Sequence, residues 1–177
     1  GQSPDNIGRM DMRLKAKTAI ITGGASGIGE AAVTRFAVEG CDVTIADINP
    51  AGEALAKKIT DAGGRVTFVV TDMTDFAEIQ SLFDAHMDRC GKLDILFNNA
   101  GKDGPGKPVA ETSEEELDEL LSVNFKSVFL ACKLAAPIMT KAGRGSIIST
   151  SAGSAREGLA WPNIGAYIAS KGAIISF

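Results

Sequence analysis

Tyr167 and Lys171 are the side chains whose types and spacing best suit acid and base chemistry. They are separated by one helical turn, so on a helix they share one face. A free phenol with a pKa near 10 is a poor base at neutral pH, but a nearby ammonium group favours the phenolate. The pair could therefore give and take a proton, although a Tyr-x-x-x-Lys spacing by itself is usually a surface pair.

A glycine-rich segment near the start of the chain has the pattern of a phosphate-binding loop. Residues 22–29 read Thr-Gly-Gly-Ala-Ser-Gly-Ile-Gly, directly after an apolar strand and directly before a helix. Gly23 permits the tight turn, Gly27 lets the backbone approach a diphosphate, and Gly29 allows the helix to pack closely on the strand. The helix N-terminus adds free N–H groups and a positive dipole end. The segment predicts a dinucleotide site that includes Ser26 and Ile28, and the missing Gly-Lys-Ser/Thr ending excludes a nucleoside-triphosphate loop.

Asp47 closes the second predicted strand and indicates which dinucleotide binds. A carboxylate at this point accepts hydrogen bonds from the adenosine ribose hydroxyls and repels a 2′-phosphate, which favours NAD over NADP. Asn49 and Pro50 are better placed than Asp47 to begin the next helix. We therefore predict NAD as the cofactor, with Ile48 beside Asp47 in the same site.

These residues need a framework, and the order of apolar segments predicts one. Short runs rich in β-branched residues predict buried parallel strands over 18–22, 43–47, 66–70, 95–98 and 147–151. Helices are predicted over 28–39, 50–62, 75–90 and 113–141, each with a glycine near its end, and Ser113 and Glu116 form a capping box. The alternation predicts an α/β fold with a doubly wound parallel sheet, the Rossmann fold.

The composition narrows the classes of partner. The 22 acidic and 18 basic residues form no basic stripe, so neither nucleic acid nor a membrane surface is expected as a partner. No uninterrupted apolar run reaches the roughly 18 residues of a membrane span. The three cysteines lack a CxxC spacing and predict reduced thiols in a cytoplasmic protein. His86 has no neighbours at ligand spacing, so no metal is predicted.

The sequence also predicts the domain organisation and the oligomeric state. Residues 1–11 are expected to be a cloning remnant or a flexible arm, and residues 12–177 to form one dinucleotide-binding and catalytic domain. The helix predicted over 113–141 becomes apolar on every side after its first turns, which requires a cover besides the sheet. A second subunit is the expected cover, in a homo-oligomer such as a dimer or tetramer.

Three motifs in this order resemble the short-chain dehydrogenase/reductase family. They are the glycine loop, Asn98-Asn99-Ala100-Gly101 after the fourth strand, and Tyr167-Ile168-Ala169-Ser170-Lys171 near the end. The resemblance runs from about Leu14 to the last residue and fits the short, single-domain members. It implies an oxidoreductase that transfers a hydride between NAD(H) and a secondary alcohol or ketone.

The resemblance also implies a role for individual residues. Tyr167 would be the general acid or base, Lys171 would also hold the nicotinamide ribose, Ser151 would donate to the substrate oxygen, and Asn124 would anchor a water that relays protons. Five further residues would meet or support the cofactor: Asp72 and Met73 at the adenine, Asn98 as a tie between strands, and Ala100 and Gly101 along the ribose and nicotinamide. The loop that carries Trp161, Pro162 and Asn163 and the segment 102–108 would border the substrate.

Several alternatives stay open at this point. Ser154 lies thirteen residues before Tyr167, the more usual family spacing, whereas Ser151 is favoured because it ends the predicted strand. Asn124 could equally be a buried structural amide. Family members are longer than this chain, so the last strands are expected to be missing and the fifth strand to form an exposed apolar edge. A dinucleotide-binding protein without turnover and a non-catalytic association fragment are the competing functions.

Overall fold

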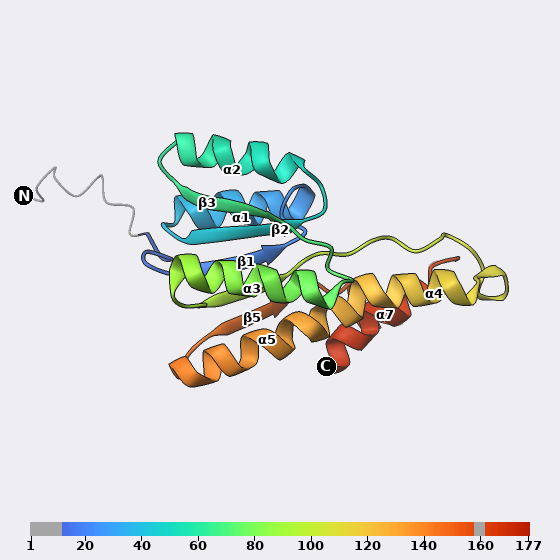
Figure 1. Ribbon diagram of the computed structural model, residues 1–177. Coiled ribbons are helices and arrows are strands. Elements are labelled where there is room, and N and C mark those ends of the chain that lie inside the picture. Colours follow the sequence, from blue (N-terminus) through green and yellow to red (C-terminus); the bar gives the residue numbers. More distant parts are fainter. Residues whose placement is uncertain (1–11, 158–161) are drawn as a thin grey trace, which may run out of the picture.

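Five parallel strands form the centre of the chain (Figure 1). The computed structural model describes residues 12–157 and 162–177, so the expected arm over 1–11 lies outside the described residues. The strands are β1 (Thr18–Thr22), β2 (Asp42–Asp47), β3 (Arg65–Val70), β4 (Ile95–Asn98) and β5 (Ser146–Ser149), in the spatial order β3-β2-β1-β4-β5. This arrangement confirms the predicted doubly wound α/β sheet, with boundaries within about two residues of those expected.

Helices cover both faces of the sheet. Helices α1 (Gly27–Val38) and α2 (Ala51–Asp61) lie on one face, and α3 (Phe76–Cys90) and α5 (Ser127–Ala142) lie on the other (Figure 1). Alternation along β1 supplies both cores, because Ala19 and Ile21 point to the first pair of helices and Ile20 points to the second. All three side chains are completely buried.

Helix ends follow the predicted signals. The Ser113 hydroxyl accepts a hydrogen bond from the backbone N–H of Glu116, and the Glu116 carboxylate accepts one from the backbone N–H of Ser113, which completes the capping box. Asp75 caps α3, and Gly91 and Gly143 end α3 and α5 in the left-handed conformation that glycine adopts most easily. Asn49, as expected, accepts from the backbone N–H of Ala51 at the start of α2.

The helix predicted over 113–141 is one continuous rod with a change of pitch. It consists of α4 (Glu114–Leu121), the π-helical turn η3 (Ser122–Lys126) and α5. By length and composition, the stretch Glu114–Ala142 is apolar enough to cross a membrane, although it contains no uninterrupted apolar run of that length. A helix that covers a sheet passes the same test, and Val128, Ala131 and Ala135 are buried in the core.

The two edge strands correct the prediction that all strands are buried. In β3 Val66 alone is buried and Val70 is 64% exposed. Ile147 and Ile148 are 40% and 44% exposed, so neither face of β5 is fully covered by the described residues. Because β5 pairs with β4 alone, it is one edge of the sheet, and β3 is the other. The expectation of an exposed apolar edge is thus confirmed. A run of apolar residues predicts a strand, but it does not show whether other elements pack on both faces of that strand.

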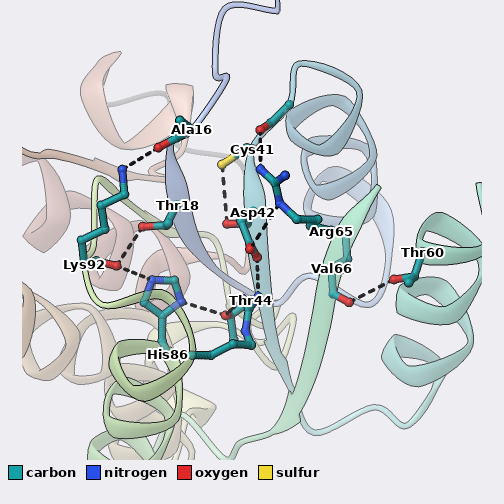
Figure 2. Close-up of polar contacts among 12 residues, drawn as sticks. Ala16, Thr18, Cys41, Asp42, Thr44, Thr60, Arg65, Val66, His86 and Lys92 are labelled. Carbon is teal, nitrogen blue, oxygen red and sulfur yellow. Dashed lines mark hydrogen bonds and ion pairs between the residues drawn. The ribbon is translucent and has the colours of Figure 1, made fainter. Parts of the chain in front are cut away.

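A polar layer lies at the amino ends of β1, β2 and β3 (Figure 2). The His86 ring is fully buried, with Nδ1 2.8 Å from Thr44 Oγ1 and Nε2 3.0 Å from the Lys92 carbonyl oxygen. Because a carbonyl only accepts, Nε2 carries the proton and Nδ1 accepts from Thr44. Arg89 donates to Thr44 and pairs with Asp42. His86 is therefore a packed structural residue held as a neutral ring.

We expect His86 to make the chain less stable in acid. Burial, followed by the charge of Arg89, lowers the pKa of His86 from 6.5 to about 4. The unfolded state then binds more protons between these two values, so the stabilisation is complete above pH 6.5 and is lost as the pH falls towards 4. The loss should be about 3 kcal/mol of unfolding free energy. Urea unfolding at several pH values measures it, and His86→Gln should remove that part of the pH dependence; an equal dependence in the variant contradicts the assignment.

Candidate active site

A cleft of about 970 Å³ lies across the carboxyl ends of all five strands. The residue at or directly after the end of each strand lines it: Gly23, Asp47, Thr71, Asn99 and Thr150. The strand order reverses at β1, between β2 and β4, and open parallel sheets bind their ligands in the crevice at such a reversal. The fold thus puts a site of ligand size where the motifs were expected to meet.

The glycine loop forms the floor of the cleft, and two of its glycines are required by close packing. A Cβ on Gly29 would lie 2.0 Å from the Gly23 carbonyl oxygen, and a Cβ on Gly23 would lie 2.8 Å from Ala100 Cα. A Cβ on Gly27, by contrast, would meet no atom within 4 Å, and Gly27 has a φ of +54°. The first two glycines bring backbones together, whereas Gly27 faces open space in the cleft.

Asp47 is fixed beside this loop by two backbone N–H groups. Its Oδ2 accepts from Ala25 at 3.0 Å and its Oδ1 accepts from Asn49 at 2.9 Å. The carboxylate therefore ties the end of β2 to the glycine loop, and its neighbour Ile48 is 68% exposed in the cleft. Asp72 lies at the same end, where its Oδ1 accepts from the Thr74 N–H and hydroxyl at 2.8 and 2.7 Å.

Tyr167 and Lys171 enter the other end of the cleft from α7 (Gly165–Ser176). Lys171 is 4% exposed, and its Nζ donates to the Thr150 carbonyl at 3.2 Å. Burial lowers the pKa of Lys171, and Asp103 partly offsets this. The expectation that Lys171 lowers the pKa of Tyr167 is not met in this structure, because burial and then the Asp103 carboxylate raise that pKa.

Asn124 holds this end of the cleft together from the π-helical turn. It is fully buried, accepts from the Lys102 N–H at 2.8 Å, and donates to the Lys102 carbonyl and to Ser170 Oγ, both at 3.0 Å. A Cβ on Gly101 would lie 3.0 Å from Lys171 Nζ and 3.1 Å from Asn124 Oδ1. Gly101 therefore leaves room for the two polar groups, which face the same small space.

The two candidate catalytic serines, Ser151 and Ser154, do not lie where the sequence predicted. Strand β5 ends at Ser149, so the reason for preferring Ser151, that it ends the strand, is wrong by two residues. The Ser151 hydroxyl donates to the Lys171 main-chain carbonyl at 2.7 Å, and Ser154 lies on α6 (Gly153–Glu157). Neither serine lines the cleft as described. Their roles stay predictions.

The structure brings most of the predicted residues together. Those that line the cleft are Gly23, Ser26, Gly27, Ile28, Asp47, Ile48, Asp72, Met73, Ala100, Gly101, Tyr167 and Lys171. Asn98 lies beneath it and ties β4 to β5 by donating to Ser149 Oγ at 3.2 Å. Lys102 and Asp103, inside the predicted border 102–108, also line the cleft, whereas Trp161 lies outside the described residues.

Some lining residues were not predicted. Thr71, Asn99 and Thr150 follow strand ends, and the rule that ligands bind there could have found them. Glu119 and Val123 come from the long helix, and no local pattern marks them. The described residues contain no cluster of His, Cys, Asp and Glu suited to a metal ion.

Comparison with known proteins agrees with this geometry. Tropinone reductase-like 2 of Erythroxylum coca is 42% identical over 166 residues, which cover 92% of this chain and 58% of the relative. (+)-Borneol dehydrogenase 1 of Salvia officinalis is 39% identical over 166 residues, with 92% and 62% covered. The chain thus spans about three fifths of the length of these relatives.

Solved structures give the same picture. A 7α-hydroxysteroid dehydrogenase complexed with NADH and 7-oxo glycochenodeoxycholic acid matches with a TM-score of 0.86 and 35% identity, over 92% of this chain and 63% of the other. NAD+-bound xylitol dehydrogenase matches with a TM-score of 0.87 and 30% identity, over 93% and 63%. A family model described as short chain dehydrogenase matches residues 17–177. The chain belongs to the short-chain dehydrogenase family.

Proposed function

We propose that this chain is the cofactor-binding and catalytic part of an oxidoreductase that transfers a hydride between NAD(H) and a secondary alcohol or ketone. One observation carries the proposal: a single cleft joins the glycine loop at one end to Tyr167 and Lys171 at the other. A dinucleotide laid along the strand ends would reach both. Two of the solved relatives were determined with NADH or NAD+ bound, which supports the choice of cofactor.

The amino end of α1 is suited to hold the diphosphate. The first N–H groups of a helix have no intrahelical acceptor, and the helix dipole favours an anion there. The N-cap residue Ser26 makes no side-chain hydrogen bond to the helix, so its hydroxyl does not occupy these donors. Gly27 leaves space at the same point. The residues present therefore fit a diphosphate.

Asp47 supports NAD rather than NADP. Its carboxylate is held in place by Ala25 and Asn49, and lone pairs remain for the adenosine ribose hydroxyls. A 2′-phosphate at this position would meet a fixed negative charge. Asp72 and Met73 line the same end and are proposed to meet the adenine.

Tyr167 is proposed to donate a proton in reduction and to accept one in oxidation. The bound nicotinamide would supply the hydride acceptor or donor. The raised pKa of Tyr167 keeps the phenol protonated in the chain alone, which suits the acid role. Lys171 is proposed to hold the nicotinamide ribose. Ser151 is proposed to donate to the substrate oxygen after its hydroxyl turns away from the Lys171 carbonyl, and Ser154 is the alternative donor.

Asn124 is proposed to anchor a proton relay from Lys171. Both amide hydrogens and one lone pair are used within the protein, so Oδ1 keeps one lone pair on the side of Lys171 Nζ. The same contacts fix the Gly101–Asp103 segment, so Asn124 also has a structural role. The two alternatives for this residue are thus compatible.

The outer face of the long helix supports assembly into a homo-oligomer. Phe129 on this helix is 46% exposed, and its ring centroid lies 5.5 Å from that of Phe177, which follows α7 and is 58% exposed. Leu117 is 36% exposed nearer the start of the same helix. We propose that a second subunit covers this surface. A cytoplasmic location is proposed as well, since the three cysteines are free.

Replacing Gly27 by alanine should weaken NAD binding without unfolding the chain. A left-handed alanine costs roughly 1 kcal/mol, and the new methyl group would occupy the diphosphate position. Gly143→Ala is a matched control, because Gly143 has a φ of +67°, equally open surroundings and no place in the cleft. Titration with NADH, followed by nicotinamide fluorescence, should show at least about a tenfold loss of affinity for Gly27→Ala alone. Equal affinity in both variants would refute the diphosphate site.

Cofactor preference should depend on the charge of Asp47. We expect NADH to bind at least about tenfold more tightly than NADPH, because the carboxylate repels the additional phosphate. Asp47→Asn keeps the size of the side chain and removes its charge, so it should reduce the difference in affinity between NADH and NADPH. Parallel titrations with both cofactors measure this, and tighter binding of NADPH to the unmodified chain would reverse the assignment.

Tyr167→Phe should abolish turnover and leave NADH affinity unchanged. Loss of the proton donor should lower kcat by at least about a hundredfold. The complete protein is assayed across a panel of secondary alcohols by nicotinamide absorbance. Turnover that survives the substitution would contradict the role of Tyr167, and an absence of turnover despite NADH binding would favour a dinucleotide-binding protein.

A further inference from the structure

Asp103 is a carboxylate in the cleft that the proposed chemistry does not use. It lines the reaction end together with Tyr167 and Lys171, and its side chain is exposed. Among the described residues, no hydrogen bond or ion pair engages its carboxylate. The two lysines of the segment 102–108 are occupied elsewhere: Lys102 pairs with Glu119, and Lys107 pairs with Glu116, each at 2.5 Å.

The backbone on both sides of Asp103 is fixed. The preceding residue, Lys102, is held by Asn124 through its N–H and its carbonyl. The following residue, Gly104, lies against α7, where a Cβ would be 3.1 Å from Tyr167 Cβ. Asp103 is thus an unpaired charge at a defined position beside the proposed proton donor. Consistent with this proximity, its charge contributes to the raised pKa of Tyr167 and opposes the lowering of the Lys171 pKa.

The other charges that line this end of the cleft are Lys102, Glu119 and Lys171. Lys102 pairs with Glu119, so these two cancel, and Lys171 is 4% exposed and donates to the Thr150 carbonyl. Asp103 is therefore the exposed charge at this end that has no partner among the described residues. An unpaired charge on the wall of a cleft attracts the opposite sign and repels its own.

We infer that Asp103 is a specificity-determining residue that selects an alcohol or ketone bearing a cationic group, such as a protonated amine, and disfavours one bearing a carboxylate. The inference rests on the proposed function, since it places the substrate beside Tyr167. The cationic group of the substrate would lie beside the Asp103 carboxylate while the reacting carbon lies beside Tyr167. The two charged groups would form an ion pair, and no covalent bond to the protein forms.

The test compares two ring compounds of similar size and opposite charge, cyclohexylammonium and cyclohexanecarboxylate. Each is titrated into the chain saturated with NADH, and nicotinamide fluorescence reports binding. We expect the ammonium compound to bind at least about tenfold more tightly, with the ratio falling in Asp103→Asn to within about twofold. Asp118→Asn is the matched control, because it removes the same charge from an exposed residue of α4 outside the cleft; its ratio should stay that of the parent chain.

A second measurement tests the position of Asp103 and needs neither turnover nor cofactor. Tyr167 is the single tyrosine of the chain, so the phenolate absorbance reports its titration directly. The charged groups that line this end of the cleft are Asp103, Lys102, Glu119 and Lys171. Asp103→Asn should lower the pKa of Tyr167, and Asp118→Asn should leave it unchanged.

The inference is overturned if the two compounds bind equally, if the carboxylate binds more tightly, if neither binds, or if Asp103→Asn preserves both the ratio and the pKa. Turnover that survives Tyr167→Phe would instead contradict the proposed function. It would not change the result of the ligand titration or of the Tyr167 titration. The two failures are therefore distinguishable.

Discussion

The contact between the end of β1 and the start of α1 is the constraint on which the site depends. Gly29 lies so close to the Gly23 carbonyl that a single Cβ would be 2.0 Å from the oxygen, and Gly23 is similarly close to the backbone of Ala100. Strand β1, helix α1 and the segment after β4 can therefore meet only through glycine. Their meeting leaves the free N–H groups of α1 at the centre of the cleft.

The reaction end of the cleft depends on a second device, the π-helical turn in the long helix. An added residue in one turn changes the face on which the following residues lie, and such turns are frequent at functional sites. Here the backbone N–H of Ser127 donates to the Ser122 carbonyl, and Asn124 is directed inwards to Lys102 and Ser170. One amide thereby positions the segment that carries Asp103 and the helix that carries Tyr167 and Lys171.

Much of this could be predicted from the sequence, because local patterns determine it. Apolar runs and glycine ends located the strands and helices, and the motif around Gly27 and the pair Tyr167 and Lys171 located both ends of the cleft. The π-helical turn was not predictable, since no local pattern marks it, and Asn124 within it bonds to residues distant in the sequence. The raised pKa of Tyr167 in the chain without cofactor was not predictable either, because burial and the position of Asp103 cause it, and residue spacing shows neither. The exposure of β5 depends on what packs beside it, which an apolar run does not encode.

The central claim is that the phenol of Tyr167 faces the nicotinamide ring of a dinucleotide whose diphosphate rests on α1. The most direct measurement follows the ultraviolet titration of this one phenol with saturating NAD+ and again without it. The positive charge of the oxidised ring should favour the phenolate, so the account predicts a lower pKa in the complex. Superimposable titration curves, with NAD+ binding verified separately, would contradict it.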